Sequence, residues 1–185
     1  MIFQTNSKLK KDKIYKFSLP YKKTCPGKGD CEDYCLWINV LKRRGDKCID
    51  AHERNLKLSL ERYFPQMCIF ELEQSPRIEF VRWQDTGDVY SQYYLDKLQW
   101  VAHRTPDVFH YLYTKSLHLK WDKWDGLKNT KRINSFGGKY DNLIDRRKPH
   151  SILVEKGKPI PDGYTDCTES DMLAVNSVRI ALYKR

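Results

Sequence analysis

The stretch RIEFVRWQDTGDVYSQYYLDKLQWVAHRTPDVFHYLYTKSL, residues 77–117, constrains the fold more than any other part of the chain. Its apolar and β-branched residues predict one strand over 78–83 and another over 108–113. Between them Ser91 is placed to cap a helix, whose apolar residues recur at helical spacing at Tyr94, Leu95, Leu98, Val101 and Ala102. Strand, helix and strand in this order form a βαβ unit, which requires two parallel strands joined by a right-handed crossover.

The rest of the chain predicts the same class of fold. Short strands are expected at four further places, residues 14–20, 132–138, 150–157 and 178–184. Strands that alternate with helices are typical of α/β proteins. We therefore expect a single α/β domain over residues 1–185, with about six strands in a mostly parallel sheet that is open or forms part of a barrel.

Three helical segments are predicted between the first strand and the βαβ unit, the last of them one or two turns over MCIFELEQ, residues 67–74. The first begins at Asp33 and stops at Gly45. The second opens with Asp50 and Glu53, which resemble a capping box, and ends where Pro65 intervenes. This places Cys35 in the first turn of a helix, where the helix dipole would stabilise a thiolate.

Composition limits the setting in which the protein works. The chain has no run of about 18 apolar residues, and its N-terminus lacks the apolar segment of a secretory signal. We therefore expect no membrane span and a cytoplasmic location. In a reducing cytoplasm, clustered cysteines are more often metal ligands or redox groups than disulfides.

The charge balance indicates which partners are favoured. The formal net charge is +10, and a basic protein attracts polyanions because neutralising phosphates releases counterions. Nucleic acid and an acidic host protein are the expected partners. A solvated lysine-rich surface explains the same charge without any partner.

Three of the six cysteines lie in the segment TCPGKGDCEDYC, directly after the first predicted strand. Cys25, Cys31 and Cys35 have the spacing C-x5-C-x3-C, whereas zinc sites normally use pairs two to four residues apart. Iron–sulfur clusters accept more varied spacings, and three cysteines can hold a four-iron cluster whose fourth iron takes another ligand. A four-iron cluster is the preferred interpretation, and zinc or unmetallated thiols are the alternatives.

Cys48 and Cys167 are the candidates for a fourth thiolate. Cys48 is close in sequence, whereas Cys167 precedes the last strand and reaches the site only if the topology brings it to the same edge of the sheet. We predict Cys167 as the fourth ligand and keep Cys48 as the alternative. Cys68 lies in an apolar segment and is expected to be a small buried residue, and His110 is expected to be a core or surface histidine and no ligand.

Further candidate residues follow predicted strands. Ligands of parallel α/β proteins collect at the carboxyl ends of the strands. Gly87 and Asp88 follow the second strand, and Lys115 follows the third. Lys115 stands between two hydroxyl residues and is a candidate for binding a phosphate or carboxylate. We expect one edge of the sheet to bring these groups and the cysteines together.

These motifs support two resemblances to known proteins. The cysteine segment after the first strand and the Gly-Asp turn after the second resemble the N-terminal part of radical S-adenosylmethionine enzymes, whose usual spacing is C-x3-C-x2-C. That resemblance implies S-adenosylmethionine at the open iron, with Gly87, Asp88 and Ser91 near its amine. On the residues alone, Gly87 makes a tight turn, and Asp88 and Ser91 satisfy the start of the next helix.

The closer resemblance is to the phage-encoded gene product 88 family. The segments TCPGKGDCEDYC, RWQDTGDVYSQYYLDKLQWVAHRTPDVFHYLYTKSL, FGGKYDNLI and GYTDCTESDMLAV resemble its motifs in their order, over about residues 14 to 183. The resemblance implies a phage or mobile-element origin and specifies no activity. Two classes of function remain: an iron–sulfur protein, with radical-type enzymology as its extension, and a basic binding module with a structural metal.

Overall fold

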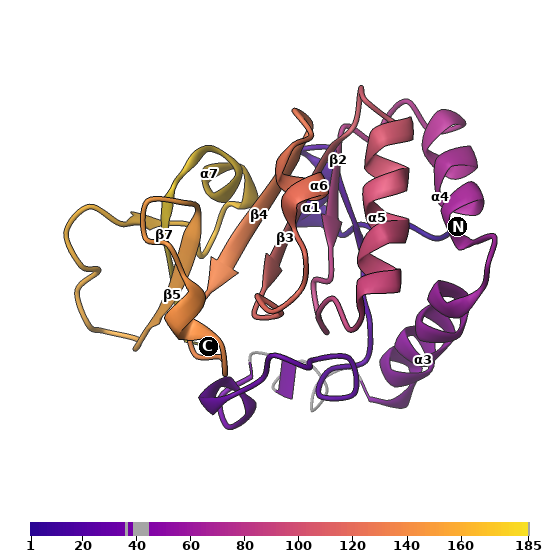
Figure 1. Cartoon of the computed structure of the whole chain (residues 1–185). Coiled ribbons are helices and arrows are strands. Elements are labelled where there is room, and N and C mark those ends of the chain that lie inside the picture. The colour runs from indigo at the N-terminus through magenta and orange to yellow at the C-terminus, as the bar shows by residue number, and fades with distance from the viewer. Residues whose placement is uncertain (36, 39–44, 185) are drawn as a thin grey trace.

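The computed structural model describes residues 1–35, 37–38 and 45–184. Within them, seven parallel strands form one sheet in the order β1-β2-β3-β4-β5-β7-β6. The strands are β1 Ile14–Phe17, β2 Phe80–Trp83, β3 Phe109–Thr114, β4 Thr130–Ser135, β5 His150–Val154, β6 Thr165–Asp166 and β7 Arg179–Tyr183. In the described part of the chain β1 and β6 are separate edges, so the sheet forms an open barrel (Figure 1).

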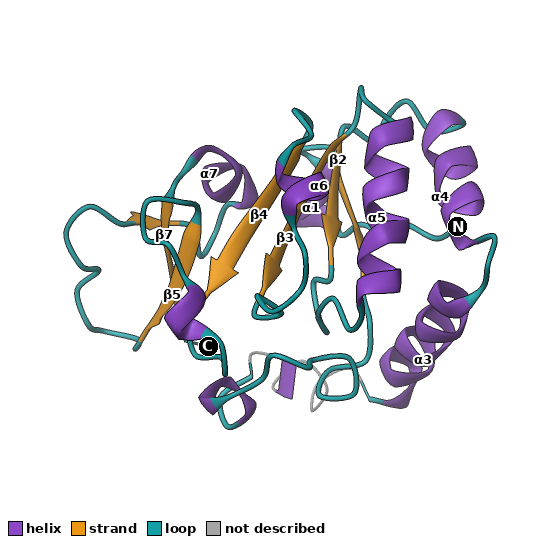
Figure 2. Cartoon of the chain, in the orientation of Figure 1, coloured by secondary structure: helices purple, strands orange, loops and turns teal. Residues whose placement is uncertain are grey.

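Helices cover the sheet unevenly (Figure 2). The helices of the described residues are α1 Ser7–Lys10, α3 Asp46–Leu60, α4 Phe64–Glu73, α5 Gln92–Arg104, α6 Asp122–Asp125 and α7 Asp171–Asn176, with the 3-10 helices η1 Asp30–Glu32 and η2 Asp141–Leu143. α4 and α5 lie side by side against one face of the sheet. The two short helices α1 and α7 pack on the other face.

The main hydrophobic core lies between the outer face of the sheet and the longer helices. Phe17, Trp83 and Leu112 point to this face from β1, β2 and β3 and are fully buried. They pack with Phe64 of α4 and Leu98 of α5 in one cluster. Burial of such large side chains contributes on the order of 2 kcal/mol each, so this layer supplies much of the stability of the fold.

The inner face of the sheet has a polar row where the outer face is apolar. Lys16, Arg82, Tyr111 and Lys131 are successive register partners on β1, β2, β3 and β4. Because side chains alternate along a strand, all four point to the same face. The row therefore places three basic side chains inside the open barrel.

The start of the chain touches the far side of the barrel. Leu9 of α1 is buried in the same cluster as Ala174 of α7 and Ile180 of β7. Lys8 Nζ donates a hydrogen bond of 3.1 Å to the carbonyl oxygen of Thr168, which lies just after β6. α1 and α7 together close part of the interior that the curled sheet leaves open.

The predicted α/β class and the parallel, barrel-like sheet are confirmed, including the βαβ unit β2-α5-β3. Ser91 caps α5, and its Oγ accepts a hydrogen bond of 3.1 Å from Tyr94 N. The expected strand count was one too low, because β6 has only two residues. A strand of that length is too short for an alternating pattern to be recognised.

Two predicted helix boundaries are wrong. α3 begins at Asp46 after Gly45, so Asp50 lies inside the helix and forms no capping box. Pro65 stands in the first turn of α4, where a missing N–H costs nothing, instead of ending the preceding helix. The helix predicted from Asp33 to Gly45 falls largely on residues 36 and 39–44, which lie outside the described residues, and Cys35 itself is not helical.

His110 predicts how the core responds to acid. Trp83 Nε1 donates to His110 Nδ1 at 3.2 Å, and Thr105 Oγ1 lies 2.9 Å from His110 Nε2. Complete burial lowers the pKa of this histidine from 6.5 to about 3. The unfolded chain therefore takes up the proton first, so the stabilisation is complete above pH 6.5 and is lost as the pH falls towards 3.

We expect the free energy of unfolding to fall by about 2–3 kcal/mol between pH 7 and pH 4.5 through His110. Urea unfolding of His110→Gln should show a smaller loss over this interval than the parent protein. His103→Gln, on the exposed side of α5, is the control and should behave like the parent. Equal pH dependence of all three proteins would contradict the prediction.

Candidate functional site

The cysteine segment lies across the carboxyl ends of the central strands. Figure 1 shows it running below the ends of β3 and β4. Asp88 N donates to the carbonyl oxygen of Thr24 at 3.1 Å, and Cys31 N donates to that of Gly137 at 3.1 Å. The segment is thus tied by its backbone to the residues that follow β2 and β4.

Two glycines make this close approach sterically feasible. A Cβ on Gly27 would collide with the carbonyl oxygen of Lys115, and a Cβ on Gly87 would lie 2.8 Å from Leu19 Cβ. Gly87 also has a φ of +77°, a backbone conformation that residues with a Cβ rarely adopt. The glycines in these loops therefore allow the cysteine segment to sit directly on the strand ends.

A cavity of about 430 Å³ joins the cysteine segment to the inner face of the sheet. Of the eight site residues predicted from the sequence, seven line it: Cys25, Cys31, Cys35, Gly87, Asp88, Lys115 and Cys167. Ser91 is not among the described lining residues, and neither is Cys48. Residues from four parts of the chain thus meet at one cavity.

The Cys25 thiol resists ionisation. Burial, together with the charges of Asp88, Cys35 and Cys31, raises its pKa to about 12. A metal would have to displace this proton, because thiolates are the ligating form. The described residues contain no group of three or more His, Cys, Asp or Glu side chains close enough to hold a single metal ion.

Cys167 lines the cavity from a distant part of the chain. It directly follows β6, and its Sγ donates to the carbonyl oxygen of Thr165 at 3.4 Å. It is buried in the inner cluster with Leu9 and Ile133, and burial raises its pKa. Cys48 instead lies on α3, with its Sγ 4.0 Å from His52 Nε2.

The carboxylate of Asp88 links the residues that follow β2 to the end of β3. Its Oδ1 accepts from Thr114 Oγ1 and from Val89 N, both at 2.7 Å, and its Oδ2 accepts from Lys115 N at 2.8 Å. Burial raises the pKa of this carboxyl despite the three donors. Ser91 caps α5 as its local sequence indicates. The same expectation for Asp88 is wrong, because its carboxylate hydrogen-bonds Val89 and the end of β3 and no residue of α5. Contact with a cofactor stays a prediction.

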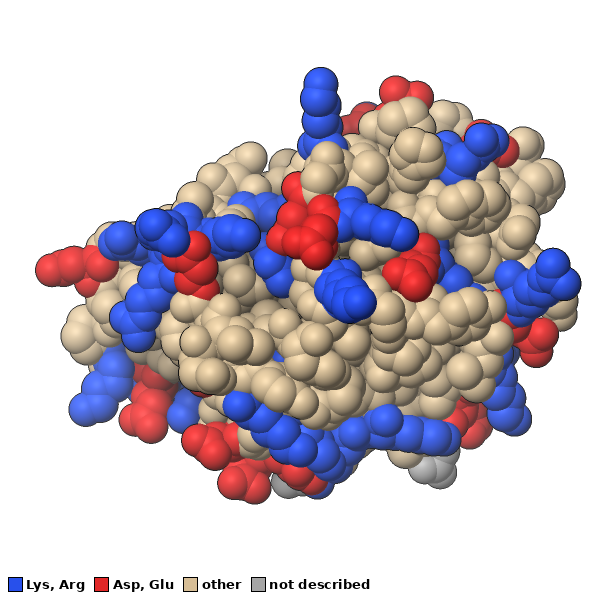
Figure 3. Space-filling model, viewed as in Figure 1, with Lys and Arg blue, Asp and Glu red and all other residues tan. Residues whose placement is uncertain are grey.

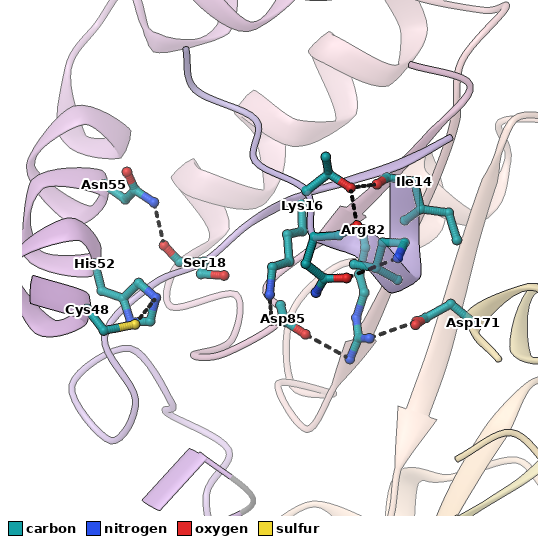
Figure 4. A network of polar contacts seen from close by, with 12 residues as sticks. Ile14, Lys16, Ser18, Cys48, His52, Asn55, Arg82, Asp85 and Asp171 are labelled. Atoms are coloured by element: carbon teal, nitrogen blue, oxygen red, sulfur yellow. Dashed lines mark hydrogen bonds and ion pairs between the residues drawn. The ribbon is translucent and has the colours of Figure 1, made fainter. Parts of the chain in front are cut away.

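A charged network inside the barrel was not predicted from the sequence (Figure 4). Arg82 Nη1 donates to Asp171 Oδ1 at 2.7 Å, and Arg82 Nη2 lies 3.4 Å from Asp85 Oδ1. Lys16 also pairs with Asp85, and Tyr111 donates to Asp171 Oδ1 at 3.1 Å. Burial alone would raise the pKa of Asp85, but Arg82 and Lys16 outweigh it and hold the pKa below its ordinary value.

One sequence signal for this network exists. Lys16 and Arg82 each interrupt an apolar strand, in IYKF and FVRW, and they occupy paired positions on adjacent strands. A charge within a strand that is covered on both faces is costly unless it is paired or functional. Two such interruptions in neighbouring strands therefore indicate a polar interior.

His52 of α3 lies at the edge of the same network (Figure 4). Its ring packs on Trp37 with 4.7 Å between centroids, and Trp37 lines the cavity. Burial, assisted by the charge of Lys16, lowers the pKa of His52 to about 4, although Asp85 opposes this shift. His52 is therefore neutral at pH 7.

Comparison with known proteins assigns the chain to a family. Residues 1–181 match the family described as gene product 88. The chain belongs to this family. Its membership confirms the closer of the two resemblances and supports a phage origin. No curated protein and no solved structure matches the chain, so the resemblance to radical S-adenosylmethionine enzymes has no support from these comparisons.

One expectation from composition is met in the described part of this gene product 88 protein. None of its helices there has both the length and the apolar character that crossing a bilayer requires.

Proposed function

We propose that this chain is an iron–sulfur protein that holds a four-iron cluster with Cys25, Cys31 and Cys35 at the mouth of the open barrel. The observation that carries the proposal is that these three thiols line one cavity at the carboxyl ends of parallel strands. This is the edge at which parallel α/β proteins place their ligands.

The donor set fits a cluster. All three ligands are thiols, which iron–sulfur clusters prefer. A four-iron cluster holds its thiolates further apart than a single ion does, so it suits cysteines that share a wall of the cavity without forming a compact one-ion site. When bound, such a cluster supplies one-electron chemistry.

Three cysteines leave one iron for a further ligand. We propose S-adenosylmethionine for this position, because Gly87 and Asp88 line the same cavity. Cys167 is the competing protein ligand, since it lines the same cavity. The Cys167→Ser variant distinguishes S-adenosylmethionine from Cys167 as the ligand of the fourth iron.

Anaerobic loading with iron and sulfide tests the proposal. We expect about four irons per chain and a brown protein with thiolate-to-iron absorption. Cys31→Ser should lose at least half of the iron, because it removes a ligand, whereas Cys48→Ser should load like the parent. Cys167→Ser should load normally if the fourth iron is open, and a spectral change on adding S-adenosylmethionine is expected then.

The opposite results have distinct meanings. A colourless protein with one zinc per chain would support the alternative, a basic module in which the metal is structural. A parent protein that binds neither iron nor zinc would overturn both assignments. Equal iron in Cys31→Ser and Cys48→Ser would remove the cysteine segment as the ligand source.

Nucleic-acid binding is the competing proposal that rests on charge. Figure 3 shows Lys and Arg side chains spread over one face of the molecule with acidic side chains among them. Mobility shifts with DNA and RNA over a salt series test this proposal, because phosphate contacts make affinity fall steeply with salt. Absence of binding at low salt would remove it.

A further inference from the structure

The interior of the barrel contains polar groups that the proposed cluster does not use. Arg82 and Lys16 lie within β2 and β1, whereas the cysteines lie beyond the strand ends. Both basic residues line the cavity, together with Asp85 and Asp171. The cavity volume of about 430 Å³ lies within the range of small-molecule sites.

Three residues that line the cavity have buried polar side-chain atoms without a hydrogen-bond partner among the described residues, namely Arg82 Nε, Gln84 Oε1 and Thr86 Oγ1. The amide nitrogen of Gln84 donates to Tyr94 Oη of α5 at 2.8 Å. Buried polar groups are nearly always paired, so three orphans at one strand end need an explanation. Gln84 is only 3% exposed and has a φ of +51°. Strained backbone of this kind concentrates at ligand sites.

The edge of the Arg82 guanidinium formed by Nε and Nη2 can bind a ligand. Its Nη1 is held by Asp171 at 2.7 Å, but its Nη2 is 3.4 Å from Asp85 and its Nε has no partner among the described residues. Nε and Nη2 form the side of the fork that binds a carboxylate with two parallel hydrogen bonds. Lys16 also pairs with Asp85, so Asp85 stays neutralised if Arg82 turns to a ligand.

The charge of the cavity favours an anion. The described lining residues include five basic and three acidic side chains, namely Lys8, Lys16, Lys28, Arg82, Lys115, Asp85, Asp88 and Asp171. The small excess of positive charge and the Nε–Nη2 edge of Arg82 suit one planar carboxylate. Leu153 and Leu182, which also line the cavity, provide apolar surface for the rest of the molecule.

We propose that the interior of the open barrel binds a small molecule through a carboxylate, which takes Nε and Nη2 of Arg82 in place of the long contact with Asp85. This inference deepens the proposed function, because it names the substrate class of that site. The binding itself needs no cluster, so the two proposals fail separately.

The test uses acetate, succinate and benzoate as probes, each beside its primary amide. Saturation-transfer NMR on the reduced, metal-free full chain should detect the acids, with the amides binding at least about tenfold more weakly. Arg82→Lys keeps the charge but removes the fork, and it should weaken the acids about tenfold or more. Arg82→Lys is also loaded with iron and sulfide, and it should bind as much iron as the parent protein.

Arg132 gives a matched control for Arg82. It also lies on a strand, pairs with an aspartate at 2.7 Å and stacks on an aromatic ring at 5.1 Å, but it is not among the described residues that line the cavity. Arg132→Lys should leave acid binding unchanged. Equal weakening by both substitutions, or equal binding of acids and amides, would overturn the inference.

A measurement on the parent protein covers the case in which Arg82→Lys does not fold. The NMR signal of Arg82 Nε–H should move on addition of an acid, because an unpartnered donor gains an acceptor. A signal that stays in place while the protein still loads iron would reject the carboxylate site and leave the cluster proposal intact. Acid binding by a protein that loads no iron would do the reverse.

Discussion

Gly27→Ala is expected to lower the free energy of unfolding by about 3 kcal/mol or more and to abolish iron loading. The added Cβ would collide with the backbone carbonyl of Lys115 and would lie 3.0 Å from Ser116 N. Backbone atoms at the end of β3 have no side-chain rotation with which to give way. The cysteine segment must therefore lift from the strand ends, and this moves Cys25 and Cys31 away from the cavity.

Gly157→Ala separates this steric effect from backbone strain. Gly157 has a φ of +86°, and a Cβ there would meet nothing within 4 Å. Its substitution should cost only the left-handed backbone, about 1 kcal/mol, and should leave iron loading unchanged. Urea unfolding and iron analysis of both variants decide the matter. Similar losses for the two would mean that the segment does not press on β3.

The elements that the sequence predicted well are those with strong local patterns. α5 has a capping serine and apolar residues at helical spacing, so both its existence and its start were predicted. The start of α3 was missed, because Gly45 stands at its N-cap without a side-chain hydrogen bond. β6 was missed because two residues contain no periodicity. Prediction thus failed where the boundary depends on tertiary contacts.

In the candidate site too, the residues with a local sequence signal were predicted, and those joined only by the tertiary fold were not. The strand-end rule found the cysteine segment, Gly87, Asp88 and Lys115, since each directly follows an apolar run that the sequence displays. Cys167 was predicted as a spare cysteine before the last strand and not by this rule, and it lines the same cavity. The ion pair between Arg82 and Asp171 joins residues 89 positions apart, and no local pattern links them. Only the curled sheet and α7 bring the two side chains together.

Arg82→Met is expected to lower the free energy of unfolding by about 3 kcal/mol or more at pH 7. The substitution leaves Asp171 with only the hydroxyl of Tyr111, and Asp85 with only Lys16, among the partners found in the described residues. Removing one partner of a buried ion pair costs more than the pair contributes, because a charge stays buried without compensation. Arg132→Met, which removes a single pairing with Asp125, should cost about 1 kcal/mol.

The loss of unfolding free energy caused by Arg82→Met should become smaller as the pH falls. This pH dependence distinguishes the loss of a charge from the loss of packing contacts. In the parent, Arg82 helps to hold the pKa of Asp85 below its ordinary value, so this contribution is present at neutral pH and is lost in acid. In the variant, burial is less opposed and the folded-state pKa rises, so the folded state gains stability as its carboxylates take up protons. Urea unfolding at pH 7 and pH 4.5 should therefore show the smaller difference between the two proteins at pH 4.5. Adding Asp171→Asn to the variant should restore part of the loss at pH 7, because it removes the uncompensated charge. A difference that is equal at both pH values, with no recovery in the double variant, would mean that Arg82 stabilises the barrel by packing alone.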